Sequence, residues 1–237
     1  LVTMWALHSH DALRLLGLLF SFLLFGIPIY LLLIFYYDPQ ATLRFQNQTI
    51  GLSFLFERLF FPRHVERKIM LNAQVEGKVV LELGASSGLL SRAISRRHPH
   101  QQIIVERSLA TKSFLQRRLS RAEDVTFIHD EHLMSRIHPD IRHADEVFSF
   151  GILSNLTDER IFIKHLSRIL PENARIHLFD YVDLYKVIPN KEFLSDYERL
   201  KQMFREEGFA VNIRKIRGLL WNYLVIDGIK TRHDVAF

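Results

Sequence analysis

A run of glycine, serine and acidic residues near the middle of the chain has the types and the spacing of a ligand-binding turn. Glu82-Leu83-Gly84-Ala85-Ser86-Ser87-Gly88 follows a short β-branched and leucine-rich run and leads at once into a helical pattern. Gly84 can adopt backbone angles that are closed to other residues, and Gly88 allows the start of a helix to pack close to a ligand. Such a turn between a strand and a helix favours binding of a phosphate- or sugar-sized group.

The same spacing, Gly84-x-Ser86-x-Gly88, also fits the nucleophile elbow of α/β-hydrolases, with Ser86 as the nucleophile. A hydrolase elbow follows several earlier strands and an oxyanion loop of the His-Gly-Gly-Gly type. The residues before Val79 are instead mostly a hydrophobic stretch and a basic linker. Their composition therefore disfavours the hydrolase interpretation.

The composition excludes several kinds of chemistry. The 237 residues carry a formal net charge of +5 and include no cysteine, which excludes disulfides, cysteine-zinc sites and thiol nucleophiles. Basic residues are scattered rather than gathered in one run, which favours anionic lipid or a protein partner over nucleic acid. The histidines lack a second ligand pair at a recognised metal-binding spacing, so no metal site is expected.

Residues 15–37 contain no charged side chain, and a helix of this length is about what the ~30 Å hydrocarbon layer of a membrane requires. The uniform apolar composition and the aromatic end favour a transmembrane helix over a buried core helix or a signal peptide. Positive charge follows the span, so the positive-inside rule places the carboxyl-terminal part in the cytosol, or in the matrix of a mitochondrial inner membrane. The basic residues concerned are Arg44, Arg58, Arg63, Arg67 and Lys68.

These patterns divide the chain into five parts. The expected parts are an amino-terminal flank (1–14), a transmembrane helix (15–37), a basic and aromatic interfacial linker (38–76), a folded domain (77–230) and a carboxyl-terminal tail (231–237). Within the linker, residues 50–61 predict an interfacial helix that is too short to cross a membrane, and residues 64–68 predict a polar connector.

In the folded domain, strand and helix signals alternate, which is typical of a mostly parallel sheet covered by helices. Strand patterns lie at residues 79–83, 102–106, 125–129, 146–150, 175–179, 210–216 and 221–226. Helical patterns lie at residues 89–97, 108–122, 158–170 and 193–207, with a short turn or helix at 133–137. The last two strands are close enough to form an antiparallel hairpin, so we expect a doubly wound, mostly parallel, seven-stranded α/β sheet.

The order of these motifs resembles that of the class I S-adenosylmethionine-dependent methyltransferase family, over about residues 79–230. The segment from Glu82 to Gly88 resembles the acidic-x-Gly-x-Gly-x-Gly loop of the family, with Ser86 in place of the middle glycine. His129-Asp130 resembles the Gly-Asp pair after the third strand. Further landmarks in the same order are Phe148-Ser149-Phe150-Gly151, Leu170-Pro171-Glu172-Asn173 and Gly208-Phe209.

The resemblance implies S-adenosylmethionine as the cofactor. It implies that Glu106, 24 positions after Glu82, accepts hydrogen bonds from the ribose hydroxyls, because one carboxylate can accept two from a vicinal diol. Asp130 is implied for the adenine amino group, and Glu82 for support of the loop. The complete implied set is Glu82, Gly84, Ser86, Gly88, Glu106 and Asp130.

The acceptor side of the site carries less information. Methyl transfer requires mainly alignment of the reacting atoms, so catalytic residues are hard to identify from sequence. Ordinary loop polarity and helix capping explain any single candidate better than a catalytic role does. The candidates that would face the site are His129, Glu131, His132, Asn155, Asp180 and Tyr181.

Two functions follow from these patterns. The first is a membrane-anchored S-adenosylmethionine-dependent methyltransferase acting on a small or lipophilic acceptor, with residues 15–37 in contact with membrane lipid. The absence of an Asn/Asp-Pro-Pro-Tyr motif argues against methylation of nucleic acid bases. The alternative is an inactive methyltransferase-like accessory subunit of a larger membrane complex, which is motivated by the departures at Ser86, His129 and Ser154-Asn155.

Overall fold

The structure is a computed structural model that describes residues 15–27, 61–120, 122, 124–130, 139–156, 158–184, 188–218 and 222–231. The chain divides after residue 48 into two compact units, and each unit is described by itself.

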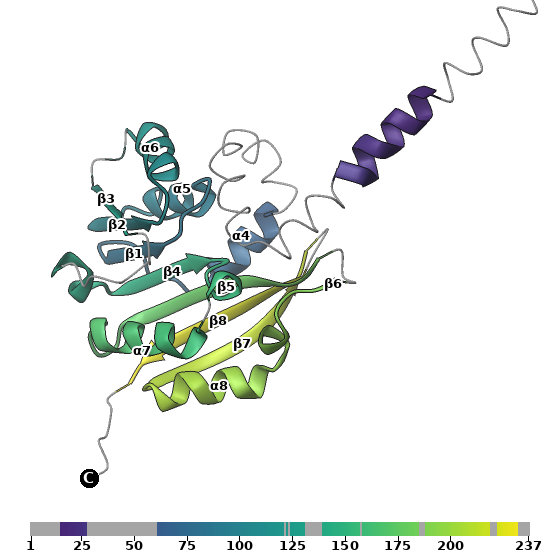
Figure 1. Ribbon diagram of the computed structural model, residues 1–237. Coiled ribbons are helices and arrows are strands. Elements are labelled where there is room, and N and C mark those ends of the chain that lie inside the picture. The colour runs from purple at the N-terminus through teal and green to yellow at the C-terminus, as the bar shows by residue number, and fades with distance from the viewer. Residues whose placement is uncertain are drawn as a thin grey trace, which may run out of the picture. The chain divides into compact units, whose positions relative to one another are not determined.

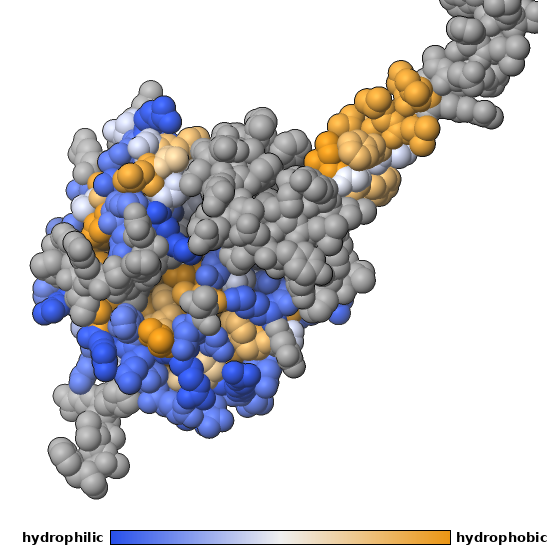
Figure 2. Space-filling view, in the orientation of Figure 1, coloured by the Kyte–Doolittle hydropathy of each residue, from blue (hydrophilic) through white to orange (hydrophobic). Residues whose placement is uncertain are grey.

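In the first unit, residues 15–27 are helical and include the π-helical turn η1 (Phe22–Gly26). Large apolar side chains are exposed all along this helix, with Leu16 and Leu18 each 70% exposed, and Figure 2 shows its almost uninterrupted apolar surface. Within the ranges that the structure describes, no helix is both long and apolar enough to cross a membrane. The expected span over residues 15–37 continues into residues 28–37, which lie outside the described ranges, as do residues 38–60.

The second unit contains a sheet with the strand order β3-β2-β1-β4-β5-β8-β7, and the short β6 pairs with the end of β5 (Figure 1). Strands β1 to β5 run parallel to one another, whereas β6 and β8 run antiparallel to β5, and β7 runs antiparallel to β8. The sheet is therefore mixed rather than all parallel. Its main path has the predicted seven strands and ends in the predicted antiparallel hairpin, and the two-residue β6 is an eighth strand that the sequence does not predict. The strands are β1 (Val79–Leu83), β2 (Gln101–Glu106), β3 (Val125–His129), β4 (Glu146–Phe150), β5 (Arg175–Leu184), β6 (Ile188–Pro189), β7 (Phe209–Arg217) and β8 (Asn222–Lys230).

Three of the described α-helices of the second unit begin at polar residues that cap them. Ser108, Asp158 and Asp196 precede three of the helices, and each side chain accepts a hydrogen bond from the backbone N–H three residues further on. The described α-helices are α4 (Arg63–Ile69), α5 (Leu89–Ser95), α6 (Leu109–Arg118), α7 (Glu159–Ile169) and α8 (Tyr197–Glu206). Short 3₁₀ helices are η2 (Pro139–His143), η3 (Leu153–Asn155) and η4 (Glu192–Ser195).

Helices cover both faces of the sheet, because successive residues of each strand point to opposite faces. Leu81 and Leu83 of β1 pack with apolar residues of α7 and α8 on one face. Val80 packs with residues of α4 and α5 on the other face, where α6 packs on Ile104 of β2. The predicted doubly wound arrangement is confirmed.

Helix α4 belongs to the core of the second unit, although the sequence predicts a polar connector at residues 64–68. Its Val65 and Ile69 are fully buried. The ring centroid of Phe61, two residues before the helix, lies 5.3 Å from that of Phe150 and 5.9 Å from that of Phe179. The connector prediction is therefore wrong, because the apolar residues of this short helix lie four positions apart, on one face.

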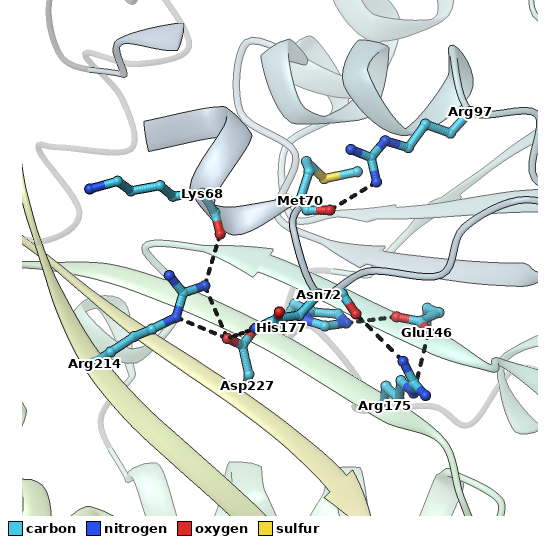
Figure 3. Close-up of polar contacts among 9 residues, drawn as sticks. All are labelled: Lys68, Met70, Asn72, Arg97, Glu146, Arg175, His177, Arg214 and Asp227. Atoms are coloured by element: carbon cyan, nitrogen blue, oxygen red, sulfur yellow. Dashed lines mark hydrogen bonds and ion pairs between the residues drawn. The ribbon is translucent and has the colours of Figure 1, made fainter. Parts of the chain in front are cut away.

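Polar contacts also attach this region to the sheet (Figure 3). His177 of β5 is buried between two carboxylates, 2.6 Å from Glu146 and 2.8 Å from Asp227. Arg214 of β7 donates to Asp227 and, at 2.8 Å, to the backbone carbonyl of Lys68 in α4. The side chain of Asn72, beyond α4, also donates to Asp227 at 3.0 Å. The network therefore joins α4 to four strands of the sheet, β4, β5, β7 and β8.

Other differences from the sequence prediction concern the ends of elements. Strand β5 extends five residues beyond the expected end at Phe179, because β8 pairs with it along its length. The expected helix at 193–207 is divided by Asp196, which caps α8 after the short η4. The turn or helix expected at 133–137 lies outside the described residues.

Candidate functional site

Three residues with left-handed backbone angles shape the loop between β1 and α5. Gly84 has φ +70°, Ser86 has φ +52° and Gly88 has φ +80°. The N–H of Gly84 donates to the carbonyl of Val105 in β2 at 2.9 Å. A Cβ added to Gly88 would lie 2.5 Å from a methyl group of Leu115, so only glycine lets α5 and α6 approach this closely. The loop is thereby held at the carboxyl edge of the central strands.

The carboxylate of Glu106 lies directly against this loop. It is at the end of β2 and only 5% exposed, and it accepts a hydrogen bond from the N–H of Ser86 at 3.0 Å. Backbone N–H groups of Ala85 and Arg107 also donate to it. Burial raises the pKa of Glu106 to about 7, against the opposing effect of these donors and of the Arg107 charge. The expected ribose-binding acid is thus adjacent to the loop, but the loop already donates to it.

Ser87, at the centre of the loop, has a buried hydroxyl group. Its side chain is 2% exposed, and its Oγ has no hydrogen-bond partner among the residues that the structure describes. The carbonyl of Ser87 accepts a hydrogen bond from the guanidinium of Arg118 in α6 at 2.5 Å. Leaving a buried hydroxyl unpaired costs about 1–3 kcal/mol, so this atom marks a position where a bound polar group is favoured.

Glu82 lies beneath the loop rather than at its open side. Its two carboxylate oxygens accept hydrogen bonds from Ser91 of α5 at 2.9 Å and from Gln102 of β2 at 3.0 Å. The side chain is 1% exposed, and burial raises its pKa to about 8 against the opposing effect of these two donors. Glu82 therefore joins β1, β2 and α5 beneath the loop.

Asp130 reaches the same edge from β3. Its N–H donates to the carbonyl of Glu106 at 3.0 Å, and its side chain is half-buried. The neighbouring His129 forms a hydrogen bond through Nε2 with the carbonyl of Arg107 at 3.0 Å. The structure thus brings Glu106 and Asp130 together beside the loop. Glu131 and His132, two candidates for the acceptor side, lie outside the described residues.

A second polar cluster lies at the carboxyl ends of β4 and β5. Asp180 is fully buried and accepts hydrogen bonds from the N–H groups of Ser154 and Tyr181, each at 2.8 Å. Burial raises the pKa of Asp180 to about 6 and that of Tyr181 to about 12. Asn155 donates to the carbonyl of Gly151 at 2.6 Å. These acceptor-side candidates therefore line one edge with the loop, and Asp180 is a group that can gain or lose a proton near neutral pH.

Sequence reasoning missed two contributors to this edge. Arg118 is a residue of α6, and its guanidinium donates to the carbonyl of Ser87 in the loop. Lys191 follows β6 and donates to the carbonyl of Leu156, and its charge acts on Asp180. No local pattern reveals either role, because both partners lie more than 30 residues away along the chain.

Comparisons with known proteins show which solved structures have a similar fold. The chain matches no protein-family model and no curated protein. Among solved structures, a chain of the complex between the Haloferax volcanii Trm112 methyltransferase activator and the putative methyltransferase matches with a TM-score of 0.64 and 15% identity. That match covers 79% of this chain and 98% of the other.

Two further solved structures of methyltransferases have a similar fold. The N-methyltransferase NodS from Bradyrhizobium japonicum WM9, in complex with S-adenosylhomocysteine, has a TM-score of 0.61 and 11% identity, over 79% of this chain and 99% of NodS. An S-adenosylmethionine-dependent methyltransferase from Aquifex aeolicus has a TM-score of 0.58 and 16% identity, over 81% and 99%. The second unit therefore has the fold of class I S-adenosylmethionine-dependent methyltransferases.

Proposed function

We propose that this chain is a membrane-anchored methyltransferase that binds S-adenosylmethionine at the Gly84–Gly88 loop and methylates a small or lipophilic acceptor. The observation that carries the proposal is the buried hydroxyl of Ser87, which has no hydrogen-bond partner among the described residues and lies in a left-handed loop beside Glu106. These residues fit the cofactor, since the loop offers a polar partner and the adjacent carboxylate can accept hydrogen bonds from a diol.

In this proposal, the residues at the carboxyl edge of the sheet have separate roles. Glu106 and Asp130 would hold the nucleoside part of the cofactor, and Ser87 would contact its polar end. Glu82 keeps the loop attached to β2 and α5 through Gln102 and Ser91. The bound cofactor would supply a methyl group on a positively charged sulfur. The carboxyl of Asp180, with its pKa near neutral, can hold the proton that an acceptor loses.

The membrane part of the proposal rests on residues 15–37. The described portion, residues 15–27, exposes apolar side chains on all sides, and a helix of that kind requires lipid or protein around it. An enzyme attached to a bilayer meets acceptors that dissolve in it. Positive charge after the span favours a location of the second unit in the cytosol or in the matrix of a mitochondrial inner membrane.

One observation favours a second candidate, a methyltransferase-like subunit without activity. The carboxylate of Glu106 already accepts loop N–H groups and is almost fully buried, so a ribose could bind only after the loop releases it. In this alternative, the second unit serves as a rigid module inside a membrane complex. One neighbouring structure contains a methyltransferase activator, which makes a protein partner a reasonable part of either candidate.

Binding of the cofactor separates the two candidates. We expect the full chain in detergent micelles to bind S-adenosylmethionine with micromolar affinity in a calorimetric titration. Glu106→Gln should weaken binding by about tenfold or more, because the amide keeps only one of the two oxygens that accept hydrogen bonds from a diol. Glu76→Gln is a matched control, since Glu76 is an exposed carboxylate at the beginning of the domain.

The outcomes have clear meanings. Binding that Glu106→Gln weakens and Glu76→Gln leaves unchanged would support the enzyme. A folded chain that binds neither S-adenosylmethionine nor S-adenosylhomocysteine would contradict the enzyme and favour the inactive subunit.

A further inference from the structure

Helix α4 begins at the same edge of the sheet as the candidate site. The imidazole of His64 lies 3.3 Å from the backbone carbonyl of Arg217, the last residue of β7. Strands β5 and β7 both run antiparallel to β8, so the ends of both lie at the carboxyl edge of the parallel strands. Phe61, before α4, packs on Phe150 at the end of β4. The chain thus joins the domain at the edge where the candidate site lies.

The outward face of α4 is basic. While Val65 and Ile69 face the core, Arg63, Arg67 and Lys68 are exposed on the other face. Arg217 is also exposed, at the end of β7 beside the start of α4. Figure 3 shows the side chain of Lys68 extending away from the strands, while its carbonyl accepts from Arg214. We call Arg63, Arg67, Lys68 and Arg217 the basic surface.

The charge of the basic surface is not compensated within the described part of the chain. No carboxylate there forms an ion pair with any of its four members. Two adjacent cations behave differently, because Arg214 pairs with Asp227 at 3.1 Å and Lys215 pairs with Asp183 at 3.3 Å. Because carboxylates pair with Arg214 and Lys215, the four members of the basic surface remain as positive charges without an ion pair among the described residues of this region.

We propose that the basic surface binds the headgroups of anionic phospholipids and holds the carboxyl edge of the sheet against the membrane. Each lysine or arginine near an anionic bilayer adds favourable electrostatic free energy, and the effect decays within a Debye length. The exposed apolar helix of residues 15–27 ends 36 positions before Arg63, so the chain that joins them can reach the same bilayer. This inference rests on the membrane location proposed above and not on methyl transfer.

Docking in this way has a consequence for the substrate. Glu106, Asp130 and Asp180 lie at the edge that the basic surface would hold to the lipid. The acceptor would then come from the lipid headgroup region rather than from bulk water. If the chain also carries out the methyl transfer proposed above, its acceptor is amphipathic and has its reactive group at the level of the phosphates.

The absence of cysteine allows a direct test with the full chain. A fluorophore is attached at Gly218→Cys, directly after Arg217, and the chain is reconstituted in bilayer nanodiscs with a nitroxide quencher on lipid headgroups. We expect quenching to be at least about twofold stronger with roughly one third phosphatidylserine than with phosphatidylcholine alone, and to weaken with added salt. A fluorophore at Gln202→Cys, on α8 beyond the opposite face, should be quenched little.

Two charge variants isolate the basic surface. The combined variant Arg63→Gln, Arg67→Gln, Lys68→Gln and Arg217→Gln should lose the effect of phosphatidylserine. The matched variant changes four basic residues on α7 and α8, and should keep it: Lys164→Gln, Arg168→Gln, Lys201→Gln and Arg205→Gln. Circular dichroism confirms that both variants fold, and cofactor binding is measured separately, so that failure of this proposal is distinct from failure of the enzyme.

Several results would overturn the proposal. Equal quenching in the two lipid compositions would show that lipid charge has no role. Equal loss in both variants would show that net charge, rather than the basic surface, is responsible. Binding of an RNA duplex through the same four residues, with no effect of phosphatidylserine, would assign the surface to nucleic acid instead.

Discussion

At the scale of single residues, Ser86 replaces the middle glycine of a glycine-rich loop, and this replacement costs conformational free energy. Its φ of +52° lies in the left-handed region, where a side chain costs about 1–2 kcal/mol. Its side chain is exposed, whereas its N–H donates to Glu106. The backbone, rather than the hydroxyl, is therefore the part of Ser86 that the loop uses.

Ser86→Gly should raise the free energy of unfolding by about 0.5–1 kcal/mol, because relief of left-handed strain exceeds the entropy lost by glycine. Affinity for S-adenosylmethionine should stay the same or increase, since the backbone donor remains. Urea denaturation and calorimetry measure the two effects. Ser86→Ala retains the Cβ and serves as the control, and an equal gain in that variant would refute the strain argument.

At the scale of elements, the close approach of α5 and α6 depends on Gly88. The left-handed start of α5 places this residue against Leu115, which is fully buried in α6. Gly77 provides a comparison, since its φ is +68° but nothing lies within 4 Å of an added Cβ. Both glycines thus have left-handed backbone angles, and they differ in what an added Cβ would contact.

Gly88→Ala should therefore destabilise the chain more than Gly77→Ala. Both substitutions force a left-handed alanine, at about 1–2 kcal/mol each. The clash with Leu115 should add about 1–3 kcal/mol in Gly88→Ala alone. Chemical denaturation of the two variants in the same detergent gives the comparison, and equal losses would show that α6 moves aside freely.

At the scale of the whole molecule, buried acids and a buried histidine make stability depend on pH. Burial raises the pKa of Glu82 to about 8, of Glu106 to about 7 and of Asp180 to about 6. Burial lowers the pKa of His177, but hydrogen bonds to Asp227 and Glu146 outweigh it and raise the pKa overall. All four groups hold protons in the folded state that the unfolded chain would release, so stability falls as pH rises through each folded pKa.

We expect the melting temperature to fall by about 10 °C between about pH 5.5 and pH 8.5, because each pKa unit corresponds to about 1.4 kcal/mol. Glu82→Gln should make the fall shallower between about pH 6 and pH 8, since the amide does not titrate. Differential scanning fluorimetry across this range measures both curves. A melting temperature that rises over the same interval would contradict the assignment of neutral, buried acids.

Much of the fold could be predicted because it depends on local patterns. Short β-branched runs are long enough to identify β1, β3 and β4 at their observed bounds, and the glycine spacing identifies the loop. The positions of Glu106 and Asp130 at strand ends follow from the same alternation, since parallel strands end at one edge. The apolar character of residues 15–27 is also a property of the sequence alone.

Only the tertiary structure decided which polar groups are free and which are engaged. Glu106 accepts the N–H of Ser86 20 residues away, Arg118 reaches Ser87 across 31 residues, and His64 meets Arg217 across 153. Such contacts arise when packing brings distant segments together, and no local period encodes them. For the same reason, the sequence shows α4 as a charged stretch, and only packing on the sheet reveals which face is core and which is the basic surface.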